Sequence, residues 1–509
     1  MHDDNTFSIK DLHDLSTDPA HLFMQLYGLL SEDPFERKVV NDWLADDEVL
    51  QRAALVEMDV LDRGDADPVR LSHIVGWSGD RAVFTLLRGL DGALLYVNPF
   101  WPAIDAGRLH WLARRYSETG RLNNPAEFPG ALLPRCTYPG RPRGKGHKAD
   151  FFGVHVVPPE YLGRKIDHGL IPNVHQPYFH PEQEIKVACA PFLADITELG
   201  ITFRHDNGTA TYRLAPRSVS PTVEAELTAR MTAVIDKMDQ AQARIGVLPE
   251  GCLSQSLLDR WRTVARETYT NGKPLRWLLL GSGPVDGGDP PRNRAVLVDR
   301  RSGETVLVHD KIERFTLDST QVRNWRLPDV PKADRFDEDI SVGSTIQVRD
   351  SALGRLAVVI CQDMTSTTTW ERELMALGLS HLFVPIFSKP ILRYRWEHHA
   401  AARMVAELGT WVVVSNSLAV ANAIGATPRG RWYTCLVAGP MDRKRNGHEH
   451  VAQYGRARSA TDLGLVTQSR QRVLPTVFAG VVRPEWMERE IVPSQRRPGP
   501  RRAATTQAG

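Results

Sequence analysis

The feature that most constrains the fold is a regular alternation of strand and helix patterns that begins at Glu184. Short apolar runs such as RWLLLGSG and HLFVPIF have the length and composition of buried strands. Between such runs lie helical segments, for example residues 220–241, in which Leu227, Met231, Val234 and Met238 follow one another along one face. This alternation predicts a layered α/β domain.

The length of 509 residues exceeds what one hydrophobic core normally organises, so a further module is expected. We assign it to residues 1–183, with acid-rich helices up to about residue 62, a β-hairpin near residues 81–100 around Asp91-Gly92, and a basic, Pro- and Gly-rich loop at 136–150. Residues 184–485 form the α/β domain. Residues 486–509 end in SQRRPGPRRAATTQAG, a basic segment without apolar periodicity, which predicts a disordered tail.

The charge balance and the cysteines exclude several functional classes. Lys and Arg number 63 against 61 Asp and Glu, a net charge of +2, so no global field favours nucleic acid or a membrane surface as partner. The five cysteines contain no CxxC pair, which argues for a reducing compartment and against disulfides or structural zinc. The acidic N-terminus resembles no signal peptide, and no apolar stretch is long enough to span a bilayer, so we expect a cytoplasmic protein.

Three apolar runs end in a residue with reactive chemistry. Glu250 closes RIGVLPE, Lys311 closes TVLVHDK and Cys361 closes LAVVIC. Each has an ordinary structural explanation, since a glutamate can cap a helix, a lysine can extend to water and a cysteine can fill a core. However, strand ends in α/β folds converge on one edge of the sheet. A carboxylate, an ammonium and a thiol together supply what thiol-based acyl transfer requires.

The segments VLPEG, VHDKIERF and VVICQDM, in this order, resemble the motifs of the nitrilase, or carbon–nitrogen hydrolase, superfamily over residues 184–485. The resemblance implies a four-layer αββα sandwich in which Cys361 is the nucleophile and Glu250 the general base. It also implies that Lys311 and the backbone N–H of Gln362 stabilise the oxyanion, and that a second glutamate, Glu338 in FDEDISVG, lies nearby. It implies no cofactor and no metal ion, and it implies a homodimer.

The residues after the nucleophile bear on the substrate. Nitrile-hydrolysing members of the superfamily usually have Cys-Trp-Glu, whereas this chain has Cys-Gln-Asp. The departure favours hydrolysis of a small-molecule amide or carbamoyl C–N bond, through a cysteine thioester, with release of ammonia or an amine.

Three other interpretations remain possible at the level of sequence. The chain can be a catalytically silent nitrilase-like scaffold whose N-terminal module binds a partner. A nucleotide site in LLLGSGPVDGGDPP is disfavoured, because the stretch lacks both phosphate-loop patterns and its three prolines oppose a following helix. A metal site at GHEH, residues 447–450, lacks partners at ligand spacing.

Overall fold

The structure is a computed structural model. It describes residues 14–31, 33–36, 39–95, 131–134, 151–152, 154–157, 166–171, 184–206, 208–216, 221–351, 354–366, 374, 377–426, 432–440 and 450–470.

The N-terminal region forms a helical unit with its own hydrophobic core, which includes the buried rings of Phe23, Phe84 and Phe152. Asp18, Asp46 and Asp67 each accept backbone N–H groups from the first turn of a helix, so part of the acidic composition serves as helix caps. Its elements are α1 (Pro19–Leu29), α2 (Asp33–Glu36), α3 (Val39–Leu44), α4 (Asp47–Arg63), α5 (Pro68–Val75), α6 (Asp80–Leu95) and the antiparallel pair β1 (Ala131–Pro134) and β2 (Val154–Val157).

The β-hairpin predicted near residues 81–100 is wrong for the described residues 81–95, which form helix α6. The two glycines of this segment permit close helix packing instead of a turn. A Cβ atom at Gly89 would overlap Val56 of α4, and one at Gly92 would overlap the side chain of Glu57. Asp91 is buried and accepts a hydrogen bond from the Val154 N–H at 3.1 Å, which ties α6 to β2.

Two large sheets form the α/β domain. The six-stranded sheet has the order β10-β9-β8-β7-β4-β21, with β4 (Glu184–Cys189), β7 (Ile245–Val247), β8 (Trp277–Val285), β9 (Arg292–Asp299), β10 (Thr305–Asp310) and β21 (Leu465–Arg470). The seven-stranded sheet has the order β20-β19-β17-β15-β14-β13-β3, with β3 (Ile166–Leu170), β13 (Ile346–Ser351), β14 (Gly354–Val358), β15 (His381–Ile386), β17 (Trp411–Asn416), β19 (Cys435–Pro440) and β20 (His450–Gly455).

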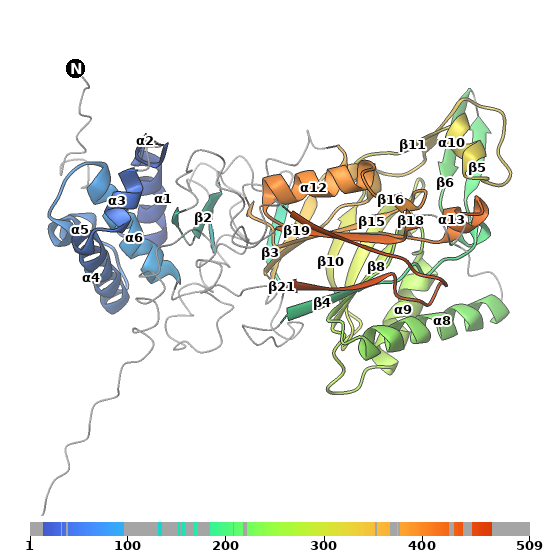
Figure 1. Cartoon of the computed structure of the whole chain (residues 1–509), viewed down its shortest axis with the longest axis horizontal. Coiled ribbons are helices and arrows are strands. Elements are labelled where there is room, and N and C mark those ends of the chain that lie inside the picture. The colour runs from blue at the N-terminus through green and yellow to red at the C-terminus, as the bar shows by residue number, and fades with distance from the viewer. Residues whose placement is uncertain are drawn as a thin grey trace, which may run out of the picture.

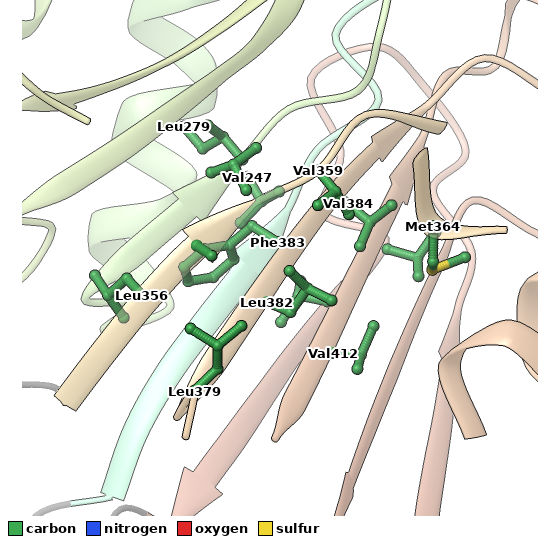
Figure 2. Packing of buried hydrophobic residues seen from close by; sticks show 14 of the residues in the cluster. Val247, Leu279, Leu356, Val359, Met364, Leu379, Leu382, Phe383, Val384 and Val412 are labelled. Carbon is green, nitrogen blue, oxygen red and sulfur yellow. The ribbon is translucent and has the colours of Figure 1, made fainter. Parts of the chain in front are cut away.

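The sheets pack face to face around one hydrophobic cluster that takes side chains from both, part of which Figure 2 shows. Alternation along β8 separates two cores, because Trp277 and Leu279 enter this cluster while Leu278 and Leu280 face helices α8 (Pro221–Gln240) and α9 (Gln255–Glu267). Helix α12 (Trp396–Leu408) packs on the seven-stranded sheet, on the opposite side from α8 and α9 (Figure 1). The layer order is therefore helices, sheet, sheet, helix, in agreement with the predicted αββα sandwich.

A smaller sheet lies beside the sandwich in the order β11-β12-β6-β5. Its strands are β5 (Thr202–Asp206), β6 (Thr209–Arg213), β11 (Thr316–Asp318) and β12 (Arg335–Glu338). The remaining elements are α10 (Ser319–Asn324), α13 (Ala419–Ala423), the pair β16 (Ile391–Leu392) and β18 (Trp432–Tyr433), and the 3-10 helices η5 (Ile196–Leu199) and η6 (Cys361–Met364).

Strand β3 pairs in parallel with β13 and so belongs to the seven-stranded sheet, upstream of the predicted domain boundary at residue 184. Several predictions lie outside the described residues: the loop at 136–150, most of a helix at 370–380, a strand at 475–484 and the tail 486–509. None of the helices in the described part of the chain has both the length and the hydropathy needed to cross a membrane.

Candidate active site

Glu250 lies three residues beyond β7 and makes an isolated parallel bridge with Ser282 of β8. Glu250 is 1% exposed, and its carboxylate accepts three hydrogen bonds. Oε1 accepts hydrogen bonds from Lys311 Nζ and Asn293 Nδ2, both at 2.8 Å, and Oε2 accepts one from the backbone N–H of Phe387 at 2.8 Å. These donors stabilise a buried negative charge that would otherwise be costly.

Lys311 follows directly after β10, and its backbone N–H donates to the Asn293 carbonyl of the neighbouring strand at 2.9 Å. Its ammonium donates to Glu250 Oε1 at 2.8 Å and to Glu338 Oε2 at 2.7 Å. An ammonium has three N–H donors. The third has no acceptor among the residues that the structure describes, so it is available to a bound group.

Glu338 and Asn293 join Glu250 and Lys311 in one buried polar cluster. Asn293 Nδ2 donates to both carboxylates, at 2.8 Å to Glu250 and 2.9 Å to Glu338, and the Phe315 N–H donates to Glu338 Oε2 at 3.1 Å. The register that the sequence left open is fixed by strand alternation in β12, since Glu338 is buried whereas Asp337 is exposed. Two carboxylates and one ammonium give this cluster a formal charge of −1.

Cys361 occupies the turn that follows β14 and is the first residue of η6. Its φ of 46° lies in the left-handed region that non-glycine residues rarely adopt, as is common where a reactive side chain is held in place. Its Sγ lies 3.8 Å from the Phe387 carbonyl oxygen, and the same residue donates its N–H to Glu250. Phe387 therefore connects the thiol to the carboxylate cluster.

The electrostatics of the cluster keep the thiol protonated in the resting state. Burial raises the pKa of Cys361 well above its usual range, the charge of Glu250 raises it further, and Lys311 only partly opposes this. Burial also raises the pKa of Glu250, against the effect of Lys311 and with the help of Glu338. Although burial alone lowers the pKa of Lys311, the two carboxylates raise it well above its usual range. The arrangement thus contains a protonated thiol, a basic carboxylate and a stable cation.

The structure brings the predicted residues Glu250, Lys311 and Glu338 into direct contact and places Cys361 next to them through Phe387. Gln362 lies in the first turn of η6, where backbone N–H groups have no intrahelical acceptor.

Tyr212 is a residue of this site that the sequence analysis missed. It lies opposite Glu338 in the parallel pairing of β6 with β12 and is 1% exposed. Burial raises its pKa well above the usual range, and the charges of Glu338 and Glu250 add to this, so its hydroxyl stays protonated beside the cluster. A signal for its hairpin was present in the Asn207-Gly208 turn dipeptide between β5 and β6.

No protein-family model matches the sequence, and no curated protein matches it. Solved structures similar to the chain include an amidase mutant from Nesterenkonia sp. AN1 with the acetamide moiety of fluoroacetamide added to its active-site cysteine, at 14% identity and a TM-score of 0.35, covering 64% of this chain and 100% of that one. Nit3 of Saccharomyces cerevisiae, a member of branch 10 of the nitrilase superfamily, matches at 14% identity and a TM-score of 0.36, with 63% and 98% covered. NitFhit of C. elegans matches at 17% identity and a TM-score of 0.33, covering 62% of this chain and 66% of that one. Structures of the nitrilase superfamily are thus among those that the chain resembles, as its motifs predict.

Proposed function

We propose that this protein is a cysteine-dependent hydrolase that cleaves a non-peptide amide or carbamoyl C–N bond through a thioester on Cys361. One observation carries the proposal. The buried Glu250 carboxylate contacts Lys311 through one oxygen and, through the other, the backbone of Phe387, whose carbonyl lies 3.8 Å from the Cys361 sulfur. A base in contact with a cation is therefore separated from a buried thiol by the backbone of one residue, and these three groups suffice for acyl transfer.

In the acylation step, the Cys361 sulfur attacks the substrate carbonyl carbon while the thiol proton moves to Glu250. A base is required because the thiol is protonated at neutral pH. The negative charge on the former carbonyl oxygen is stabilised by the third N–H of Lys311 and by the backbone N–H of Gln362. When the C–N bond breaks, Glu250 returns the proton to the nitrogen, and ammonia or an amine leaves.

In the deacylation step, water attacks the thioester and Glu250 takes its proton. The C–S bond then breaks, the proton passes to the sulfur, and the carboxylic acid leaves. Glu250 thus accepts and returns one proton in each half of the cycle. Glu338 and Asn293 hold Glu250 and Lys311 in place throughout.

The experiment that tests this proposal measures ammonia release from primary amides, carbamoyl compounds, glutamine and nitriles by the purified full-length protein. We expect turnover of an amide or a carbamoyl compound, and none by Cys361→Ala. Cys435→Ala is the matched control, because Cys435 is also a buried free cysteine but lies at the start of β19. Absence of turnover on the whole panel, or equal activity in Cys361→Ala, refutes the proposal.

A further inference from the structure

Asp363, two residues after the nucleophile, connects the segment that carries Cys361 to the segment that carries Lys311. Its side chain is completely buried. Oδ1 accepts the backbone N–H groups of Ile312 at 3.1 Å and Glu313 at 2.8 Å, immediately after Lys311. Oδ2 accepts the N–H of Ile360 at 3.1 Å, immediately before Cys361.

A fourth contact comes from a histidine. His309 of β10 is 1% exposed, and its Nε2 lies 3.1 Å from Asp363 Oδ2. An ionised carboxylate only accepts hydrogen bonds, so Nε2 carries the proton in this pair. Within the described part of the chain, His309 is the side chain that hydrogen-bonds to Asp363, and backbone N–H groups supply the other donors.

The location of this carboxylate matters because the two segments come from different sheets. Lys311 follows β10 of the six-stranded sheet, whereas Cys361 follows β14 of the seven-stranded sheet. Two sheets packed through apolar side chains have a non-directional contact, which sets their spacing less sharply than hydrogen bonds do. The hydrogen bonds of Asp363 span this interface at the point where Lys311 must be placed correctly relative to Cys361.

We propose that Asp363, oriented by His309, is a positioning residue that sets the placement of Lys311 relative to Cys361; this inference rests on the proposed hydrolase function. Asp363 touches neither the substrate nor the thiol, and it acts through the backbone on both sides. Displacements of about 1 Å between reacting groups cost up to roughly 100-fold in rate, so loss of this connection lowers kcat more than it raises KM.

Asp363→Asn is the most informative variant because it preserves size. Its amide oxygen still accepts the N–H groups of Ile312 and Glu313, but its NH₂ group faces the donors of Ile360 and His309. The hydrogen bonds to the segment after Lys311 are then kept, while those to Ile360 and His309 are lost. We expect kcat for amide hydrolysis to fall roughly 10- to 100-fold, with KM changed by less than about threefold.

Asp239→Asn is the matched control. Asp239 is also a buried carboxylate, held by Arg300 at 2.7 Å and by the Leu275 N–H at 3.2 Å, but it contacts none of the site residues. It should lose stability and keep its kcat per folded molecule. An equal fall of kcat in both variants, or a wild-type kcat in folded Asp363→Asn, overturns the positioning role.

If Asp363→Asn does not fold, two substitutions of His309 decide the question. Gln retains an N–H donor for Asp363, and Leu does not. We expect His309→Gln to stay within threefold of wild-type kcat and His309→Leu to fall about tenfold with KM unchanged. Equal kcat values for the two variants overturn the proposal. Failure of the hydrolase assignment itself is distinguished by the wild-type protein, which would then release no ammonia from any compound of the panel.

Discussion

The two ends of strand β9 each contribute to a buried ionic cluster, and the two clusters differ in the ratio of negative to positive groups. Near its start, Asn293 joins Glu250, Lys311 and Glu338, with two carboxylates around one ammonium. At its other end, Asp299 pairs with Arg276, and Asp239 pairs with Arg300 at 2.7 Å and with the partly exposed Lys273 at 3.7 Å, so that two carboxylates face three cations.

The difference separates a structural cluster from a reactive one. At the end of β9 near Asp299, Arg300 is fully buried and also donates to the Thr268 carbonyl at 3.1 Å, so its charge is compensated by Asp239 and its hydrogen bonds connect chain segments. At the other end, burial raises the pKa of Glu250, the charge of Glu338 adds to this, and Lys311 keeps an N–H without an acceptor among the described residues. A surplus of charge with unused hydrogen-bonding capacity is suited to chemistry.

The largest effect is expected from Glu250→Gln. The amide oxygen can still accept from Lys311 and Asn293, but the side chain can no longer take the thiol proton. We expect kcat to fall roughly 100- to 10,000-fold, the usual contribution of general acid–base catalysis, measured as ammonia release. A fall of less than tenfold in a folded variant means that another group is the base.

Lys311→Met and Arg300→Met test the two clusters directly against each other. Lys311→Met leaves Glu250 and Glu338 without a cation, and Arg300→Met leaves the buried Asp239 with the partly exposed Lys273 alone. Both variants should lose stability in chemical unfolding, by roughly 3–5 kcal/mol for Lys311→Met and by less for Arg300→Met. Only Lys311→Met removes an oxyanion donor, and we expect its kcat to fall a further roughly 100- to 1,000-fold per folded molecule. A similar loss of kcat in Arg300→Met would show that the clusters are not functionally distinct.

Glu338→Gln removes the surplus charge and brings the cluster to neutrality. Glu250 must be ionised to act as base, so its raised pKa places the acid limb of kcat/KM above the usual range of a glutamate. Without the repulsion from Glu338, that pKa falls, and the limb should move to lower pH. A pH–rate profile with an unmoved or higher acid limb contradicts the charge-balance explanation.

A smaller effect concerns Glu397 on α12, a buried carboxyl with no ion-pair partner among the described residues. Burial raises its pKa to about 7, although Ser388 Oγ donates to it at 3.3 Å. The folded protein then holds this proton up to about pH 7, whereas the unfolded chain releases it near pH 4.3.

Stability from this group is therefore present below about pH 4 and is lost as the pH rises through 7. Relative to Glu397→Gln, the wild type should lose up to about 3 kcal/mol of unfolding free energy between pH 4.5 and 8. Parallel stability profiles for the two proteins would show that Glu397 is not protonated in the fold.

The sequence predicted the parts of this molecule that depend on local pattern. Apolar runs located strands such as β8 and β15 but not β3, β13, β20 or β21, and helical spacing located α8, whose predicted face at Leu227, Met231, Val234 and Met238 is buried. Local pattern failed for α6, because Asp91-Gly92 has the composition of a turn, and the helix interface is revealed by the close approach of Gly89 and Gly92 to α4.

The sequence could predict which residues form the site, but not which of them contact one another. Glu250, Lys311 and Cys361 stand out because each ends an apolar run, yet Glu250 and Lys311 meet across 61 residues of sequence. Asn293 and Asp363 gave no such signal, since an amide within a strand and an acid after a cysteine are ordinary in composition. Their roles follow from hydrogen bonds that join separate strands and sheets, and no periodicity encodes those.

The most direct test of the account is to trap the acyl-enzyme. The full-length protein is mixed with an amide that it turns over, quenched in acid, and analysed by intact mass and peptide mapping, with Cys361→Ala and Cys435→Ala treated in parallel. We predict an adduct of the acyl group's mass on Cys361, present in Cys435→Ala, absent from Cys361→Ala and released as a hydroxamate by hydroxylamine. Acylation at another residue, or turnover by Cys361→Ala, would contradict it.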